Sequence, residues 1–501
     1  MGQSLPRYFE VACNEDLGGC PMRSSQTSAP VAKSESAVSE LNTFIEQRRR
    51  AREPVSDLEK FERELGDRFR AAQAEVMGEE LSRFDVDTAA VEIDGVPHRR
   101  VLRSAQTYMT ASGAVTVDRS LYSTRHDGER AVAAMEVRAG IVEGYFTPLA
   151  AQHAAWAVAH LTPQESETMF RRFGAMSPSK SSLDRLPKAL SARLEEDRRT
   201  FDQRLRSEEI PKAAHTVAVS LDGVLVPMKD GNAEAKRART RAEERLAKGP
   251  AGYSEAGCGT LTLYDREGER LHTIRLARMP EKHKATLKEQ LAGELDAVLA
   301  RRPDLRVVTL ADGAHDNWAF LAQLPGGRNE AQVVDFFHAA EHLHDAMAAA
   351  HGEASARCAG EFQKYRHILR HDGHGVEKVI RHLRYLRDHN PRRRQIASTL
   401  QYFRHHRRRM QYASLARRNV PIGSGIVEAA CKTLVAQRLK RSGMRWRHAG
   451  GQAILTLRSL EQSGRFDRAW QILAATYRRD VRLPENVVDI RARRSGAATS
   501  R

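Results

Sequence analysis

The segment His215-Thr-Val-Ala-Val-Ser-Leu-Asp-Gly-Val-Leu-Val226 begins the most regular part of the chain. It is rich in β-branched residues, which is typical of a strand. Two more strands are predicted over Gly257–Asp265 and Arg270–Met279, joined as a hairpin around Asp265-Arg-Glu-Gly268. The pattern therefore predicts three consecutive antiparallel strands.

Helices and strands alternate after this hairpin. Leucines at four-residue intervals predict a helix over Glu281–Arg301. A strand over Leu305–Ala311, a short helix over His315–Leu324 and a strand over Ala331–Phe337 follow. With a final helix after Pro421, the order β-β-β-α-β-α-β-α is that of a ribonuclease H-like α/β fold. In that fold the first and fourth strands are neighbours, and the last helix packs across them.

Three acidic residues lie on these elements. Asp222 is on the first strand, Asp312 follows the fourth strand in an Asp-Gly pair, and Glu428 lies near the start of the last helix. Each has an ordinary interpretation, because Asp-Gly is common in turns and Glu428 suits the positive end of a helix dipole. All three acidic residues, however, lie on elements that this fold brings together. Their combined positions therefore favour a single shared site over three separate ordinary roles.

Carboxylates in such a site suit phosphoryl-transfer chemistry. Two Mg²⁺ or Mn²⁺ ions about 4 Å apart can stabilise both the attacking and the leaving oxygen of an in-line displacement. Hard oxygen ligands suit these cations. We therefore expect two ions held by Asp222, Asp312 and Glu428, in a nuclease or strand-transfer site.

The charge of the chain points to a polyanionic partner. The formal net charge is +17, and residues 364–418 contain 16 Lys and Arg but three acidic residues. This density predicts contacts to the DNA backbone that salt would weaken. Trp446 either stacks on a base or packs within the protein. The candidate DNA contacts are Arg392, Arg393, Arg394, Arg407, Arg408, Arg409, Lys432, Arg438, Lys440, Arg441, Arg445 and Trp446.

The remaining composition predicts a cytoplasmic protein. The five cysteines are scattered and form no C-x-x-C pair, which argues against a zinc finger and a disulfide framework. The N-terminus has no apolar signal segment, and no apolar run approaches the length of a membrane span. We expect no membrane partner.

The segments before and after the central strands differ in character. Residues 39–210 carry charged helices interrupted at Pro54, a β-hairpin over residues 91–123, and a candidate helix-turn-helix over Leu161–Leu194. The helix-turn-helix could equally be an ordinary helical hairpin. The expected organisation is a flexible leader (1–38), an N-terminal region (39–210), the first part of the core (211–337), a basic helical insertion (338–420), the Glu428 helix with C-terminal helices (421–484), and a flexible tail (485–501).

Four blocks resemble the ISKra-type bacterial insertion-sequence transposases, which are DDE transposases related to Mutator-like enzymes. The similarity is most specific over about residues 215–460, roughly half of the chain. The blocks are Ser220–Val224, Leu310–Trp318, Asp335–Leu343 and Pro421–Trp446.

The resemblance implies that Asp222, Asp312 and Glu428 are the catalytic triad. It also implies cleavage at terminal inverted repeats and joining to target DNA, with two ends held by an oligomer. Asp335 and His338 resemble a D-x-x-H element that organises DNA near the site. Two alternatives stay open: another ribonuclease H-like nuclease such as a junction resolvase, or a non-catalytic DNA-binding protein derived from a transposase.

One competing motif overlaps this element. His338-Ala-Ala-Glu341-His342 has the H-x-x-E-H spacing of a zinc protease. No third zinc ligand stands out, and the motif follows a predicted strand as the transposase interpretation requires. We therefore do not favour zinc proteolysis.

Overall fold

The computed structural model describes residues 36–124, 131–174, 176–229, 252–324, 329–391 and 393–484. Residues 1–35 of the predicted leader and all of the predicted tail lie outside these ranges, whereas α1 already begins at Ala37. The chain divides into two compact units, Met1–Ala72 and Gln73–Arg501. Helix α1 (Ala37–Arg50), in the first unit, ends before Pro54. Helix α2 (Leu58–Phe84) begins after Pro54 and includes residues of both units. The predicted break at Pro54 is confirmed.

The N-terminal part of the second unit contains a five-stranded sheet of order β10-β1-β2-β3-β4. The predicted hairpin is formed by β2 (Val96–Thr110) and β3 (Gly113–Ser123), whose residues Thr110 and Gly113 pair. Strands β1 (Ala90–Ile93) and β4 (Val132–Ala133) extend it. Strand β10 (Val481–Arg482) pairs with β1, so the last described residues complete this sheet.

Helices follow this sheet in the chain: α3 (Ala134–Ala139), α4 (Pro148–His160), α5 (Pro163–Phe173), α6 (Lys180–Glu196) and α7 (Arg198–Leu205). Thr162 caps α5 in a reciprocal capping box with Glu165, and Gly174 ends it at φ 74°. The predicted pair of helices is confirmed. Whether it reads DNA stays a prediction.

The second sheet has the order β7-β6-β5-β8-β9. Strands β5 (Thr216–Pro227), β6 (Tyr253–Tyr264) and β7 (Arg270–Arg278) are antiparallel. Strand β8 (Arg306–Ala311) pairs with β5 in parallel, and β9 (Asn329–Val334) pairs with β8 in parallel. The chain therefore has a mixed α/β architecture in which the first and fourth strands of this sheet are neighbours.

One predicted strand was extended into a helix. The strand expected over Ala331–Phe337 ends at Val334, and Phe336 already begins helix α11 (Phe336–His351). Asp335 caps this helix, because its Oδ1 accepts the backbone N–H of His338 at 2.7 Å. The apolar pair Phe336-Phe337 therefore belongs to a helix. The sequence did not indicate this, because a short apolar run does not distinguish a strand from a helix.

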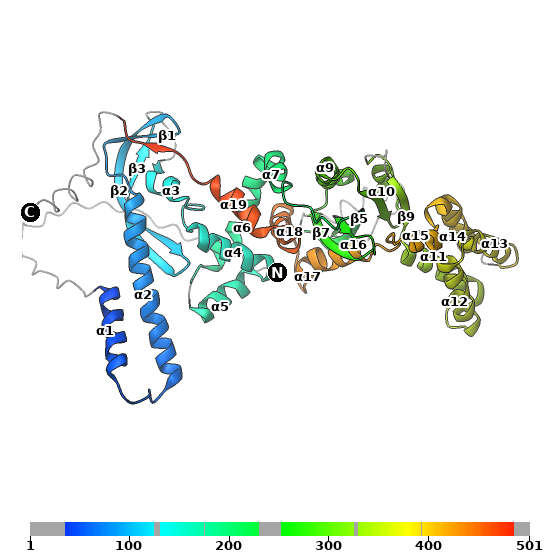
Figure 1. Cartoon of the computed structure of the whole chain (residues 1–501), viewed down its shortest axis with the longest axis horizontal. Coiled ribbons are helices and arrows are strands. Elements are labelled where there is room, and N and C mark those ends of the chain that lie inside the picture. The colour runs from blue at the N-terminus through cyan, green and yellow to red at the C-terminus, as the bar shows by residue number, and fades with distance from the viewer. Residues whose placement is uncertain are drawn as a thin grey trace, which may run out of the picture. The chain divides into compact units, whose positions relative to one another are not determined.

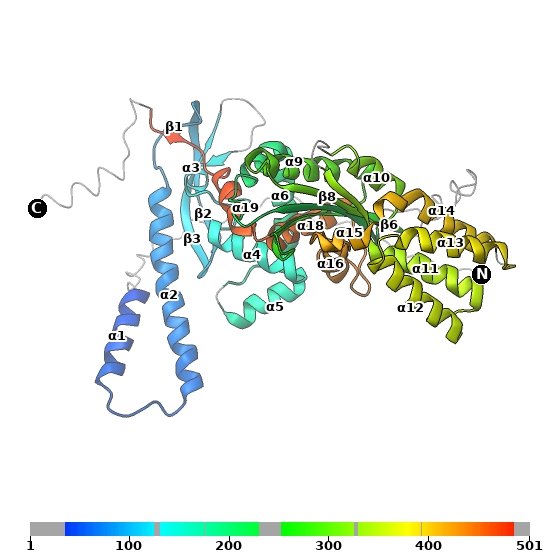
Figure 2. The ribbon, with the colours of Figure 1, turned by 45° about the vertical axis from the view of Figure 1, so that its right-hand side comes forward.

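Helices cover both faces of the second sheet (Figure 2). On one face, Gly257 and Gly259 of β6 lie against Leu287 and Leu291 of α9 (Ala285–Arg301). The alternate residues of β6, such as Cys258, pack on the other face. There they contact a continuous helix made of α16 (Gly425–Ala430), the π-helical turn η4 (Cys431–Ala436) and α17 (Gln437–Leu439). The face of β5 that carries Asp222 is therefore next to the helix that carries Glu428.

The predicted insertion between β9 and α16 is helical. It contains α11, α12 (Ala356–His371), α13 (Gly375–Asp388), α14 (Arg393–His406) and α15 (Tyr412–Arg417), coloured yellow to orange in Figure 1. Their apolar side chains share one buried cluster with the strands β5, β8 and β9. The insertion is therefore packed as part of the core.

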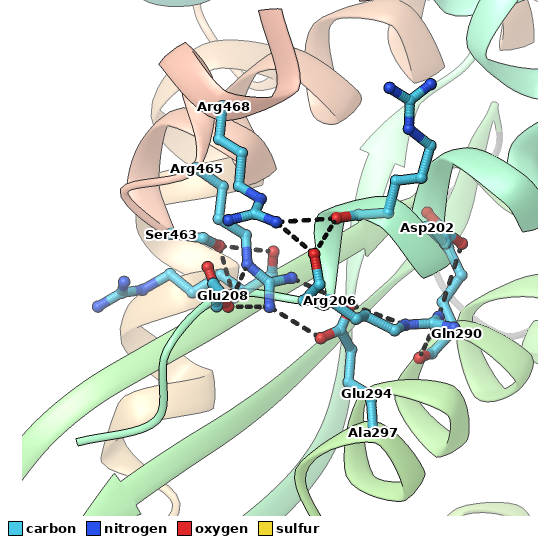
Figure 3. A network of polar contacts seen from close by, with 12 residues as sticks. Asp202, Arg206, Glu208, Gln290, Glu294, Ala297, Ser463, Arg465 and Arg468 are labelled. Carbon is cyan, nitrogen blue, oxygen red and sulfur yellow. Dashed lines mark hydrogen bonds and ion pairs between the residues drawn. The ribbon is translucent and has the colours of Figure 1, made fainter. Parts of the chain in front are cut away.

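A buried charge network holds the C-terminal helices to the second sheet (Figure 3). Arg465 lies between α18 (His448–Gln462) and α19 (Phe466–Ala475), and its side chain is 3% exposed. Its guanidinium donates to Glu294 of α9 at 2.9 and 3.0 Å and to Glu208 at 2.8 Å. Arg206 donates to Glu294 at 3.1 Å as well. Each buried charge is thus paired with an opposite one.

Among the described residues, none of the helices has both the length and the apolar character that a membrane span requires. Cys258, Cys358 and Cys431 are buried free thiols.

Candidate functional site

Asp222 lies on β5 opposite Cys258 of β6. Its Oδ1 accepts the N–H of Gly223 at 2.7 Å, and its Oδ2 accepts the thiol of Cys431 at 3.5 Å. Burial raises the pKa of Asp222, and the negative charge of Asp312 raises it further. A cation at this carboxylate would relieve both effects.

Asp312 follows β8 at the level of Asp222. The parallel register pairs Ser220 of β5 with Leu310 of β8. Asp222 and Asp312 each follow two residues later, so they lie at the same level along the two neighbouring strands. Asp312 Oδ1 accepts the N–H of Ala314 at 3.0 Å and the amide of Asn317 at 3.3 Å. Asn317 also donates to the carbonyl of Leu221 at 3.4 Å. This buried amide ties the Asp312 turn to β5, a role that the sequence analysis missed.

Helix α14 of the insertion packs directly on the Asp312 turn. A Cβ atom at Gly313 would lie 2.5 Å from Cε2 of Tyr402, so the close contact requires a glycine. His342 and His406 pack against the same tyrosine ring, with centroids at 4.1 and 5.0 Å. Burial lowers the pKa of His406 to about 4, which keeps this imidazole neutral at pH 7. The insertion therefore forms one wall of the site.

Glu428 is on α16, as expected, and it is oriented from the loop before it. Glu428 Oε1 accepts the hydroxyl of Ser424 at 2.9 Å. The backbone N–H of Ser424 donates to Asp335 Oδ2. Asp335 is fully buried, and its own N–H donates to the carbonyl of Ala311 at 3.0 Å. Hydrogen bonds therefore link the start of the Glu428 helix to the end of β8.

These contacts bring three ligand groups together. One ligand atom each from Asp335, His338 and Glu428 lies within 4.8 Å of the other two. Asp222 and Asp312 are not members of this group. Burial alone would lower the pKa of His338, but Asp335, Glu341 and Glu428 outweigh it and raise the pKa. Two carboxylates and an imidazole are a donor set that fits a divalent cation.

The H-x-x-E-H motif does not form a zinc site of its own in the structure. His338 Nδ1 lies 3.2 Å from Glu341 Oε2, and the ring of His342 packs at a tilt of 36° against Tyr402. Among the described residues, His338 is grouped with Asp335 and Glu428 instead of with His342.

The candidate DNA contacts divide into exposed and packed side chains. Two of the candidate guanidinium groups make contacts within the protein. Arg438 is 2% exposed, donates to the carbonyl of Leu161 at 3.0 Å, and its pKa is lowered by burial to about 10. Arg409 donates to Gln332 at 2.9 Å and lies 4.1 Å over the ring of Trp318.

Trp446 also packs within the protein in this structure. Its Nε1 donates to the carbonyl of Leu439 at 2.9 Å, and its backbone pairs with β5 at Pro227. Arg392 lies outside the described residues, and Arg393 begins α14. Arg441 is exposed but paired with Glu165 at 2.7 Å. The other exposed candidates are Arg394, Arg407, Arg408, Lys432, Lys440 and Arg445.

Comparisons with known proteins give little further information. No family model and no curated protein match the chain. A Drosophila P element transposase strand transfer complex is a similar solved structure, with a TM-score of 0.25 and 12% sequence identity. The similarity covers 75% of this chain and 89% of that chain. Similarity at this level decides neither fold nor function.

Proposed function

We propose that the chain is a DDE transposase with a ribonuclease H-like core. The observation that carries the proposal is the correspondence of Asp222 and Asp312 on neighbouring parallel strands, with the Glu428 helix packed across the same face. The strand order β7-β6-β5-β8-β9, with three antiparallel strands and then two parallel ones, also supports it. The substrates would be the terminal inverted repeats of an insertion sequence and a target duplex, held by an oligomer.

The residues of the site have distinct roles in this proposal. Divalent cations, when bound, would help form the attacking oxygen and stabilise the leaving oxygen, and Asp222, Asp312 and Glu428 would hold them. Cys431, Asn317 and Ser424 orient these three carboxylates, one each. The exposed Lys432 and Lys440 would bind backbone phosphates beside Glu428.

The first test uses a plasmid that carries the gene encoding this chain with its flanking DNA on both sides. We expect the purified protein to nick this plasmid at two positions that bracket the gene, with Mg²⁺ or Mn²⁺ but not with EDTA. Joining of the released ends to a second plasmid should follow, and sequencing of the junctions measures it. Binding without cleavage would support a non-catalytic DNA-binding protein. Cleavage of a four-way junction without joining would support a resolvase.

A second test concerns the insertion. Arg404, Arg407 and Arg408 are exposed at the end of α14 and in the turn after it. Each phosphate contact contributes about 0.9 to the slope of log K against log salt concentration. We therefore expect the triple substitution to glutamine to reduce the slope by about 3, measured by fluorescence anisotropy with duplex DNA.

The control is Arg199→Gln on α7, whose side chain is 87% exposed and paired with Glu289. Its slope should equal that of the wild type. An unchanged slope in the triple variant would place the phosphate contacts elsewhere on the protein.

A further inference from the structure

We infer that Asp335, His338 and Glu428 form a divalent-cation site with mixed oxygen and nitrogen ligands, which prefers Mn²⁺ to Mg²⁺. The inference rests on the proposed function, because Glu428 is shared with the proposed DNA-cleaving site. It assigns His338 to the metal, whereas the resemblance implied a role for this residue in organising DNA near the site.

The three ligands come from two helix starts that face each other. Asp335 caps α11, and His338 lies in its first turn. Glu428 lies in the first turn of α16. The backbone N–H of Phe336 donates to the carbonyl of Ile422 at 3.0 Å, so main-chain contacts hold the two starts together. The ligand atoms, within 4.8 Å of one another, can all reach one ion.

The imidazole of His338 has the partner that metal-bound histidines usually have. Its Nδ1 lies 3.2 Å from the carboxylate of Glu341, which is exposed. A proton on Nδ1 donated to this carboxylate leaves the lone pair of Nε2 free. A carboxylate on the far nitrogen fixes the ring and increases the basicity of the ligating nitrogen.

The two carboxylates are oriented by hydrogen bonds before any ion arrives. Asp335 accepts backbone N–H groups from His338 and Ser424, one on each oxygen. Glu428 accepts the Ser424 hydroxyl on Oε1, so Ser424 does not engage Oε2. Because each carboxylate oxygen can accept more than one interaction, these bonds are compatible with ligation. Binding therefore needs little rearrangement of the protein.

The nitrogen ligand determines which cation is favoured. Mg²⁺ takes oxygen ligands and keeps several waters, so a site with an imidazole nitrogen suits it poorly. Mn²⁺ also binds carboxylates, but as a first-row transition cation it accepts a nitrogen ligand more readily than Mg²⁺ does. Asp222 and Asp312 present only oxygen to an ion. We therefore expect the two parts of the site to differ in ion preference, with Mn²⁺ favoured beside His338.

The test measures Mn²⁺ binding to the full-length, metal-free protein without DNA, by electron paramagnetic resonance. Pulsed spectra should show coupling of bound Mn²⁺ to ¹⁴N, and His338→Gln should abolish the coupling. Loss of an outer-shell partner typically lowers metal affinity by about 10- to 100-fold. We expect about 10-fold weaker binding in Glu341→Gln and at least about 100-fold weaker binding at this site in His338→Gln. His367→Gln, an exposed histidine on α12, is the matched control and should bind as the wild type does.

The outcomes separate this inference from the proposed function. Bound Mn²⁺ without ¹⁴N coupling, or unchanged affinity in His338→Gln, would overturn the nitrogen site even if the protein cleaves DNA. Nitrogen-coupled Mn²⁺ in a protein that cleaves no plasmid would support the metal site and overturn the transposase proposal. Circular dichroism of each variant shows whether the fold is retained, and Glu341→Gln tests the site without removing a ligand.

Discussion

Asp222→Asn should abolish metal-dependent DNA cleavage and leave DNA binding close to that of the wild type. The substitution keeps the shape of the side chain but removes the charge that would hold a cation. Because the plasmid assay follows nicking and a mobility-shift assay follows binding, the two effects are measured separately. Asp296→Asn, at an exposed position on α9, is the matched control and should cleave normally. Normal cleavage by Asp222→Asn would exclude Asp222 from the catalytic site.

The same variant should be more stable than the wild type when metal is absent. Burial, and then the charge of Asp312, raise the folded-state pKa of Asp222 above the ordinary value of about 3.9. Between these two pKa values the folded protein binds more protons than the unfolded chain, so stability falls as pH rises through this window. At neutral pH the folded protein bears the full loss of stability that comes from ionising the buried Asp222. Asparagine carries no charge and removes this loss.

Thermal melting in EDTA checks this second effect. The melting temperature of Asp222→Asn should exceed that of the wild type at pH 7, and the difference should shrink as the pH falls below the folded-state pKa. Added Mn²⁺ should stabilise the wild type more than the variant, because a ligand stabilises the state that binds it. A variant that melts below the wild type in EDTA would contradict the interpretation that burial, and then the charge of Asp312, destabilise the ionised Asp222.

Arg465→Met should destabilise the second unit by about 3–5 kcal/mol, because it leaves the buried carboxylate of Glu294 with fewer opposite charges. Glu294 is 4% exposed at its side chain, so water cannot replace the lost partner. Figure 3 shows the guanidinium between Glu208 and Glu294. Urea-induced unfolding followed by circular dichroism measures the loss.

Two variants complete this experiment. Arg199→Met removes an exposed pair with Glu289 and should cost less than about 1 kcal/mol. Adding Glu294→Gln to Arg465→Met should recover part of the loss, since it removes the unpaired charge. If Arg465→Met and Arg199→Met cost the same, the network would not be a main support of the C-terminal helices.

Local patterns were sufficient to predict most elements of the second sheet. Alternation and β-branched residues indicated β5, and leucine spacing indicated α9, because these periodicities depend on neighbours in the chain. The positions of Asp222, Asp312 and Glu428 on their elements were predicted in the same way. Their catalytic roles stay a prediction.

Long-range packing decided the rest. Strand β10 joins β1 across nearly 400 residues of sequence, and no periodicity in a two-residue strand indicates its partner. The contact of Tyr402 with Gly313, and the burial of Arg438 against Leu161, likewise join segments far apart in the chain. Arg438 illustrates the reason: its charge and helical spacing suit a phosphate, but whether a side chain faces solvent depends on which other segment packs against it. The hydrogen bonds from Asp335 through Ser424 to Glu428 exist only once β9 and α16 meet, so the tertiary structure alone brings Glu428 beside Asp335 and His338.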